Sequence, residues 1–231
     1  MGTKKFCVIG LGHFGFNLSK ILSEAGAEVL AVDNHQDKID LLADKVTHAV
    51  CMDATDKRTM QSLGLNEMDA VIVAIGEGFE SSLLATAIIQ EIGVKKIYTR
   101  VITPIHERLL RLMNITDLLV PEATAAAQLA SRLLIPGIIE SFSLSKDYGI
   151  FEINAPKNFI NKTLIEIDLR KKYLLNLVTI KRVKKSRGLL TLGEHEEIDV
   201  FGVPTPELKI LENDILVLFG NEKDVSKLLV G

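Results

Sequence analysis

Three glycines close to the start of the chain have the spacing of a phosphate-binding turn. An apolar run, 6–9, leads into the pattern Gly-x-Gly-x-x-Gly, written in full as Gly10-Leu11-Gly12-His13-Phe14-Gly15. In this pattern the first glycine permits a tight turn, the second lets the backbone approach a pyrophosphate, and the third lets a helix pack closely on the strand. The unpaired amides at the start of that helix attract phosphate.

An acidic residue follows at the place where dinucleotide-binding units carry one. Asp33 comes directly after a second apolar run, 28–32, and is followed by Asn34. A carboxylate at this place accepts hydrogen bonds from ribose hydroxyls. The glycine pattern alone is weak, but a strand, the glycines, a helix and this acid in order indicate an adenine-nucleotide site. The alternative is a Rossmann-like turn that has lost its ligand.

Three later segments place small or polar residues after apolar runs. They are Asp53-Ala54-Thr55, Ala74-Ile75-Gly76 and Arg100. Because open parallel sheets bind ligands outside the carboxyl ends of their strands, we expect these residues to join the site, with Arg100 close to phosphate. Two alternatives remain open: Asp53 or Thr55 caps a helix at 57–63, and Arg100 forms a surface ion pair.

The elements that position these residues alternate between strand and helix through residue 120. Such alternation predicts an α/β fold with a Rossmann-like, doubly wound parallel sheet of six strands. From residue 148 the order changes, and we expect a second, small α+β subdomain with strands at 149–154, 174–183 and 215–219 and helices at 163–173 and 221–230. The domains predicted on this basis are 1–135, a hinge or linker at 136–146, and 147–231.

The helix expected at 123–134 carries almost no charge. A helix so poor in charge and rich in small residues is not typical of a solvated surface helix, and it allows another helix to approach closely. We therefore expect it to pack on a partner subunit. The alternative is burial inside its own domain.

Composition excludes several classes of function. The net charge is −3 with both signs mixed along the chain, so no basic patch indicates nucleic-acid binding, and the basic segment 184–188 is interpreted as a solvated hairpin tip. No apolar run reaches the ~20 residues of a membrane span, and the start does not resemble a signal peptide. Cys7 and Cys51 are expected to be buried free thiols in a reducing cytoplasm. No nucleophile, histidine and carboxylate have recognisable catalytic spacing, so we do not expect an enzyme.

Several of these motifs, in order, resemble the RCK (regulator of K⁺ conductance) domain. They are the glycine pattern 10–15, the acid after 31–32, the segments 53–55, 71–76 and 120–122, and, in the second half, 168–173 and 212–217. The likeness covers essentially the whole chain. Within the family the chain is most similar to the cytosolic regulatory subunit of Ktr/Trk-type bacterial K⁺ uptake systems.

The resemblance implies ligands and residue roles. It implies ATP or ADP in the N-terminal site, or NAD(H) as in Trk-like relatives, with His13 and Arg100 close to the terminal phosphates. His13 stands where arginine is usual in Ktr subunits. Glu122 matches a position that helps bind a divalent cation (Mg²⁺ or Ca²⁺) between subunits. The resemblance also implies cyclic di-AMP in the second subdomain, at the matching positions Leu164, Ile165, Arg170 and Asn176.

The resemblance further implies partners and a location. The expected assembly is a homo-oligomeric ring, an octamer of four dimers, docked in the cytoplasm at the inner face of the membrane beneath a K⁺-translocating subunit. Two other classes of function compete with this hypothesis. A small NAD-dependent oxidoreductase fits the glycine turn and Asp33 equally well, but the second half is too small to be its substrate domain. A cytosolic nucleotide or redox sensor acting on another protein is the third candidate.

Overall fold

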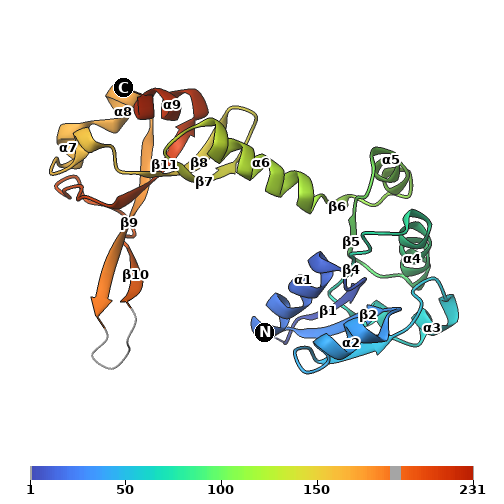
Figure 1. The fold of residues 1–231 in the computed structure, drawn as a ribbon. Coiled ribbons are helices and arrows are strands. Elements are labelled where there is room, and N and C mark those ends of the chain that lie inside the picture. Colours follow the sequence, from blue (N-terminus) through green and yellow to red (C-terminus); the bar gives the residue numbers. More distant parts are fainter. Residues whose placement is uncertain (1, 188–193, 231) are drawn as a thin grey trace. The chain divides into compact units, whose positions relative to one another are not determined.

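The computed structural model describes residues 2–187 and 194–230, and the chain divides into two compact units between Glu122 and Ala123 (Figure 1). The first unit is built on a six-stranded sheet in the order β3-β2-β1-β4-β5-β6. Its strands are all parallel. They are β1 (Lys5–Ile9), β2 (Glu28–Asp33), β3 (His48–Cys51), β4 (Ala70–Val73), β5 (Ile97–Arg100) and β6 (Asp117–Leu119). This order confirms the predicted doubly wound sheet.

Helices cover both faces of this sheet. Side chains of α1 (His13–Glu24) and α2 (Gln36–Leu42) pack on one face, against a core that includes Val8, Ala31 and Ile72. Side chains of α3 (Lys57–Gln61), α4 (Phe79–Ile92) and α5 (Pro104–Leu112), together with the short turn η1 (Leu65–Glu67), pack on the other. Strand residues are buried on both faces, as expected of a parallel sheet between helices. The strand order reverses between β1 and β4, so the helices that follow them, α1 and α4, lie on opposite faces and leave a crevice at the edge where both strands end.

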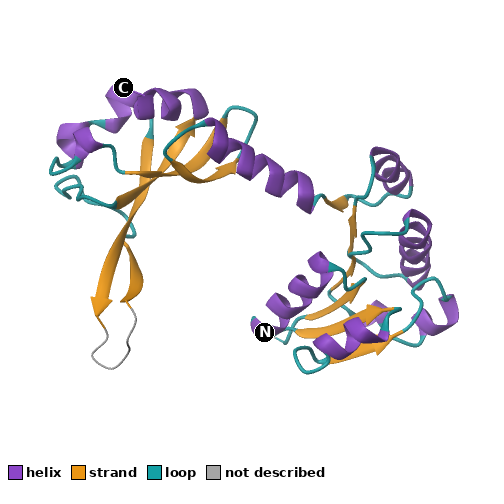
Figure 2. Cartoon of the chain, viewed as in Figure 1, coloured by secondary structure: helices purple, strands orange, loops and turns teal. Residues whose placement is uncertain are grey.

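The second unit is antiparallel, with a five-stranded sheet in the order β10-β9-β11-β8-β7 (Figure 2). Its core side chains, among them Phe151, Ile180 and Leu216, pack with residues of the helices that follow β8 and β11. The elements are α6 (Pro121–Leu134), β7 (Ile138–Ser143), β8 (Tyr148–Asn154), η2 (Lys157–Phe159), α7 (Leu164–Ile167), α8 (Leu169–Tyr173), β9 (Asn176–Arg187), β10 (Glu194–Val200), β11 (Asp214–Asn221) and α9 (Glu222–Val230). The small α+β subdomain is confirmed.

Three local features differ from the predictions for the second half. The unit boundary lies before 135, and the segment 136–146, expected as a linker, contains β7, an edge strand with few inward apolar residues. The helix expected at 163–173 is interrupted, because Asp168 adopts a left-handed conformation (φ 49°) between α7 and α8. Strand β9 continues through Lys184–Arg187 and pairs with β10, so these residues belong to a hairpin strand and not to a loop. Gly188 lies outside the described residues.

Two expectations about burial have opposite outcomes within the first unit. Cys7 is buried, and burial raises the pKa of its thiol to about 12. Cys51 is exposed, so the prediction that it is buried was wrong; it ends β3, which lies at the edge of the sheet.

Helix α6 is not buried inside its own unit. None of its residues is buried against other described residues, and the side chains of Leu129, Leu133 and Leu134 are 54%, 73% and 77% exposed. Burial within its own domain, the alternative left open by the sequence, was therefore wrong. No helix in the described ranges 2–187 and 194–230 is both long and apolar enough to span a bilayer.

Candidate nucleotide-binding site

A cavity of about 760 Å³ lies at the edge of the first sheet where its strands end. Its wall includes most of the residues predicted for the nucleotide site: Gly10, Gly12, His13, Asp33, Asn34, Asp53, Ala54, Thr55, Ile75, Gly76 and Arg100. Four other predicted residues, Leu11, Phe14, Gly15 and Ala74, do not line the cavity but pack directly behind it in the sheet and helix layers. The residues of the sequence pattern therefore fall into two groups: most line the cavity, and the others pack in the sheet and helix layers around it.

The three glycines of the turn differ in what the fold requires of them. Gly10 has φ +94°, and a Cβ there would lie 2.8 Å from the backbone nitrogen of Ile75. At Gly15 a Cβ would collide with the carbonyl oxygen of Gly10 and meet the Cβ of Ala74 at 3.1 Å. Gly12 has an ordinary backbone conformation (φ −65°), and no atom lies within 4 Å of the Cβ it lacks. Internal packing therefore explains Gly10 and Gly15 but not Gly12.

The start of α1 presents its free amides toward the same region. Gly12 is the N-cap of α1, no side chain caps this end, and its first turn contains no acidic residue. His13 is the first residue of the helix and lines the cavity. Uncapped amides and the positive end of the helix dipole favour an anion at this place.

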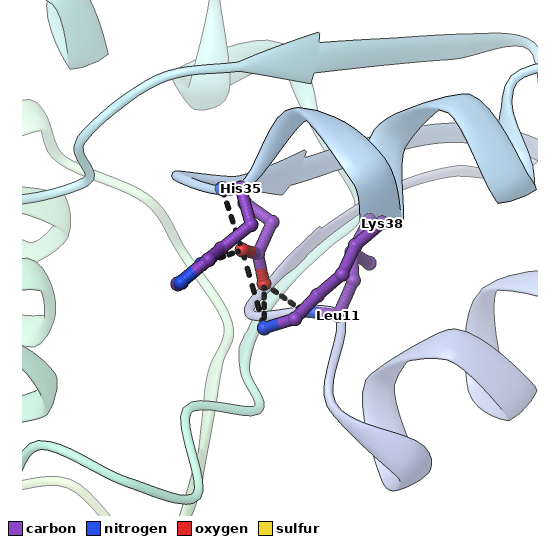
Figure 3. A network of polar contacts seen from close by, with 4 residues as sticks. Leu11, His35 and Lys38 are labelled. Atoms are coloured by element: carbon purple, nitrogen blue, oxygen red, sulfur yellow. Dashed lines mark hydrogen bonds and ion pairs between the residues drawn. The ribbon is translucent and has the colours of Figure 1, made fainter.

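Asp33 is buried at the end of β2 and is surrounded by donors (Figure 3). Its Oδ2 accepts from the Leu11 N–H at 2.6 Å, and its Oδ1 accepts from the His35 N–H at 2.9 Å. The His35 ring nitrogen Nδ1 lies 3.0 Å from Oδ1, and the ammonium of Lys38 lies 3.4 Å from both oxygens. Burial is the largest single influence on the pKa of Asp33 and would raise it, but the donors and the nearby charge together outweigh burial and lower the pKa.

Lys38 and His35 are site residues that the sequence reasoning missed. Both line the cavity, as do Met52, Glu77 and Ser81. A signal for Lys38 was present, because α2 begins at Gln36, two residues after Asn34, and its first turn must lie at the edge where β2 ends. Any ligand whose hydroxyls donate hydrogen bonds to Asp33 competes with these two side chains.

Arg100 lies in the cavity wall and also forms an ion pair, so the ion pair given as the alternative is present and the contact with phosphate stays a prediction. Its side chain is 18% exposed and packs over Gly76, and its Nη2 donates to Oε1 of Glu122. The Nε atom is buried without a hydrogen-bond partner among the described residues. Glu122 itself is 64% exposed, in the first turn of α6.

The sequence left open whether Asp53 or Thr55 caps helix α3, and the structure shows that neither does. Asp56 caps α3, accepting from the backbone N–H groups of Arg58 and Thr59. Asp53 instead accepts from the N–H of Thr55 at 2.9 Å and from its hydroxyl at 2.7 Å. Neither Asp53 nor Thr55 caps the helix, and both remain in the cavity wall.

The residues predicted to bind a cation and cyclic di-AMP do not form a complete site in the described part of one chain. Glu122 contributes one carboxylate, which Arg100 already engages, and the described residues contain no group of three or more His, Cys, Asp or Glu able to hold a metal ion. The described residues of one chain therefore do not by themselves supply the ligand set of a cation site. Of the positions expected for cyclic di-AMP, Leu164 and Ile165 lie on α7, Arg170 on α8 and Asn176 at the start of β9, and the Ile165 side chain is 62% exposed.

Comparison with known proteins identifies relatives along the whole chain. The TrkA-N domain family matches residues 6–121. The Ktr system potassium uptake protein C of Bacillus subtilis (strain 168) is 35% identical over 224 residues, covering 97% of this chain and 95% of its own. The Ktr system potassium uptake protein A of Vibrio alginolyticus is 31% identical over 228 residues, covering 99% and 97%.

Solved structures are similar at the level of the fold. The GsuK RCK domain superposes with a TM-score of 0.60 at 18% identity, covering 99% of this chain and 47% of that one. The GsuK channel bound to NAD gives a TM-score of 0.61 at 19% identity, covering 100% of this chain and 40% of that one. This chain therefore spans about half of the GsuK RCK chain, and identities this low establish the shared fold alone.

Proposed function

Because the chain belongs to the TrkA-N domain family, together with the Ktr system potassium uptake proteins A and C, we propose that it is the nucleotide-binding regulatory subunit of a K⁺ uptake system. The Bacillus subtilis Ktr protein A, 32% identical over 225 residues, covers 97% of this chain and 95% of its own length. The likeness therefore includes both units, which supports a common role for the entire chain.

The observation that best supports nucleotide binding is the glycine at position 12. No packing contact inside the protein requires a glycine there, yet Gly12 lines the cavity beside the uncapped start of α1. A pyrophosphate that approaches the backbone needs this space. Asp33, also in the cavity wall, suits a ribose, and His13 and Arg100 suit the phosphates of ATP or ADP. NAD(H) uses the same features and is the second ligand to test.

Regulation requires that the ligand bind one shape of the assembly more tightly than another. We assign the subunit contact to the exposed, charge-poor α6, because more than half of the surface of Leu129, Leu133 and Leu134 is left uncovered by the described residues. The assembly proposed is a homo-oligomeric ring, an octamer made of four dimers, in the cytoplasm beneath a membrane K⁺-translocating subunit.

Cyclic di-AMP is proposed as a ligand of the second unit near Arg170 and Asn176. A divalent cation at Glu122 would need ligands from a neighbouring subunit or from the nucleotide, and no step here depends on it.

Calorimetry with ATP, ADP, NADH and cyclic di-AMP tests the proposal directly. The parent should bind ATP and ADP, Gly12→Asp should bind neither while keeping its circular dichroism spectrum, and the matched control Gly2→Asp should bind like the parent, since Gly2 is remote from the cavity. Retained affinity in a folded Gly12→Asp variant would contradict the assignment of the site. Turnover of NADH with a substrate would favour the oxidoreductase instead, and nucleotide-dependent K⁺ flux with the membrane subunit would support the regulatory role.

A further inference from the structure

His106 is a fully buried histidine that does not line the nucleotide cavity but is bonded to the chain beside it. It lies in the first turn of α5, and 0% of its surface is exposed. Its ring nitrogen Nδ1 accepts a hydrogen bond from the backbone N–H of Ile102 at 3.2 Å. The other ring nitrogen, Nε2, is buried without a hydrogen-bond partner among the described residues.

These contacts define the protonation state of the ring. Because Nδ1 accepts from a backbone N–H, it carries no proton, and the neutral ring has its proton on Nε2. Burial lowers the pKa of His106, which favours the neutral ring further. The Nε2–H group is then a buried donor without an acceptor among the described residues, a cost that an apolar side chain would avoid. Packing alone therefore does not explain a histidine here, and the acceptor Nδ1 is what distinguishes it from an apolar residue.

The hydrogen bond to Nδ1 secures the chain directly after Arg100. Strand β5 ends at Arg100, and the N–H of Val101 donates to the carbonyl oxygen of Leu119 at 2.8 Å, which continues the contact with β6. The next N–H group, that of Ile102, donates to His106 instead. The histidine therefore holds the backbone at the point where the pairing of the strand ends.

The same ring also contacts the segment on which the guanidinium of Arg100 packs. Its centroid lies 5.3 Å from the ring centroid of Phe79, the first residue of α4. Phe79 directly follows the segment 76–78, of which Gly76 and Glu77 line the cavity. The guanidinium of Arg100 lies so close to Gly76 that a Cβ there would collide with it. One buried side chain thus touches the chain that carries Arg100 and the start of the helix that follows its packing surface.

We propose that His106 is a positioning residue for Arg100: the neutral ring fixes the backbone after β5 and the start of α4, and thereby holds the guanidinium where it meets the phosphates of the nucleotide. The inference rests on the proposed nucleotide function and adds to it a residue that touches no ligand. Arg100 needs such support, because the carboxylate of its ion-pair partner Glu122 is 64% exposed and such a pair holds a side chain weakly. A binding group keeps its geometry only when the residues behind it are themselves fixed.

Two substitutions separate the acceptor from the ring. His106→Phe keeps a ring against Phe79 and removes the acceptor, whereas His106→Asn removes the ring and keeps an acceptor oxygen close to the place of Nδ1. Calorimetry with ATP and AMP isolates the phosphate contact, because the two ligands share adenine and ribose. His106→Phe should weaken ATP about five- to twentyfold, part of the loss expected when a charged hydrogen bond is removed outright, and AMP less than about twofold. His106→Asn should restore ATP affinity to within about threefold of the parent.

A double variant and a matched control show whether the effect acts through Arg100. In an Arg100→Ala background, His106→Phe should change ATP affinity by less than about twofold, because the group that it positions is gone. The control is Leu110→Val, which removes a buried methylene from the same helix but no hydrogen-bond acceptor. It should lower the urea midpoint and leave the ratio of ATP to AMP affinity unchanged. Circular dichroism verifies that each variant is folded.

The inference and the proposed function fail in different ways. An unchanged ATP affinity in His106→Phe, equal losses for ATP and AMP, a loss that persists in Arg100→Ala, or no recovery in a folded His106→Asn would overturn the inference alone. One measurement needs no variant: NMR of the parent with ¹⁵N-labelled histidine should find the proton of the His106 ring on Nε2 at neutral pH, and a proton on Nδ1 would overturn the inference. A parent chain that binds neither nucleotide would overturn the proposed function as well.

Discussion

The backbone N–H of Leu11 donates to Oδ2 of Asp33 over 2.6 Å, so the glycine turn and the acid that ends β2 are joined directly inside the protein. Leu11 lies between Gly10 and Gly12, and Asp33 ends the neighbouring strand β2. This hydrogen bond fixes the position of the turn relative to the carboxylate in the absence of a ligand. Asp33 therefore has a role in the fold besides the contact with a nucleotide that we propose for it.

The first prediction concerns the choice of ligand at Asp33. A ribose with free hydroxyls can donate to this carboxylate, whereas a 2′-phosphate would bring a second negative charge to it. We expect the parent to bind NADPH more weakly than NADH, and Asp33→Ala to weaken ATP, ADP and NADH alike. Lys38→Met should widen the preference for NADH, because the ammonium 3.4 Å from Asp33 offsets part of the repulsion. Tight NADPH binding by the parent, measured by calorimetry, would contradict the assignment.

A second prediction concerns the stability provided by the same carboxylate. The pKa of Asp33 is lowered in the folded chain, so the unfolded chain binds the proton more readily. Its contribution to stability is therefore fully present above the unfolded value, about 3.9, and is lost as pH falls through the lower folded value. We expect parent and Asp33→Asn to differ most near neutral pH and to converge as the pH falls through the lowered pKa of the folded chain, as measured by urea denaturation. A difference independent of pH would show that the charge of Asp33 is not what stabilises the turn.

The third prediction separates the three glycines of the turn. Gly10→Ala and Gly15→Ala should each destabilise the first unit by about 1–3 kcal/mol or more, since the new Cβ meets backbone atoms that cannot move away. Gly12→Ala should change the free energy of unfolding by less than about 0.5 kcal/mol, because its Cβ points into open space. Thermal or urea unfolding of the three variants tests this order. A Gly12→Ala loss equal to the other two would mean that the fold itself needs this glycine.

A fourth prediction concerns the second unit, where Asp214 is fully buried beneath Arg182. The carboxylate accepts from Nε and Nη2 of Arg182 at 2.7 Å each and from the Leu211 N–H at 2.8 Å. Arg182→Ala would leave this charge without its partner, at a cost of roughly 3–5 kcal/mol. Lys227→Ala, which breaks a pair with a 76% exposed lysine, is the control and should cost less than about 1 kcal/mol. Similar urea midpoints for both variants would show that the buried pair contributes little.

The parallel sheet could be predicted because several of its strands are recognisable in the sequence as apolar runs. Strands β1, β2 and β4 are mainly apolar and buried, β4 along its whole length, and each ends in or leads into small or polar residues at one edge of the sheet. Edge strands of the second sheet lack that signal. In β7 only Ile138 and Ser141 are buried, and β10 has the charged sequence EHEEIDV, so neither resembled a strand.

Pairings between distant residues could not be predicted either. Glu122 stands 22 residues from Arg100, and nothing in the spacing indicates that the carboxylate reaches the guanidinium. The break between α7 and α8 was also hidden, because it depends on a left-handed conformation at Asp168, a residue type that only sometimes adopts it. Such features arise from tertiary packing, which local propensity does not contain.

The last prediction concerns Arg100 and the distinction between ATP and ADP. Its guanidinium is a permanent cation in the cavity wall with donors in a fork that matches phosphate geometry, whereas the imidazole of His13, at the start of α1, offers at most its two ring nitrogens. Arg100 should therefore carry most of the contact with the terminal phosphate. Arg100→Ala should cost ATP about 1–3 kcal/mol more than ADP, the range for a lost charged hydrogen bond. His13→Arg, which adds a permanent charge, should favour ATP over ADP and recover part of that loss in the double variant.

Calorimetry of these variants is compared with Arg108→Ala, which removes an exposed cation on α5 outside the cavity wall and should leave both affinities unchanged. Equal losses of ATP and ADP affinity in Arg100→Ala would place Arg100 away from the terminal phosphate.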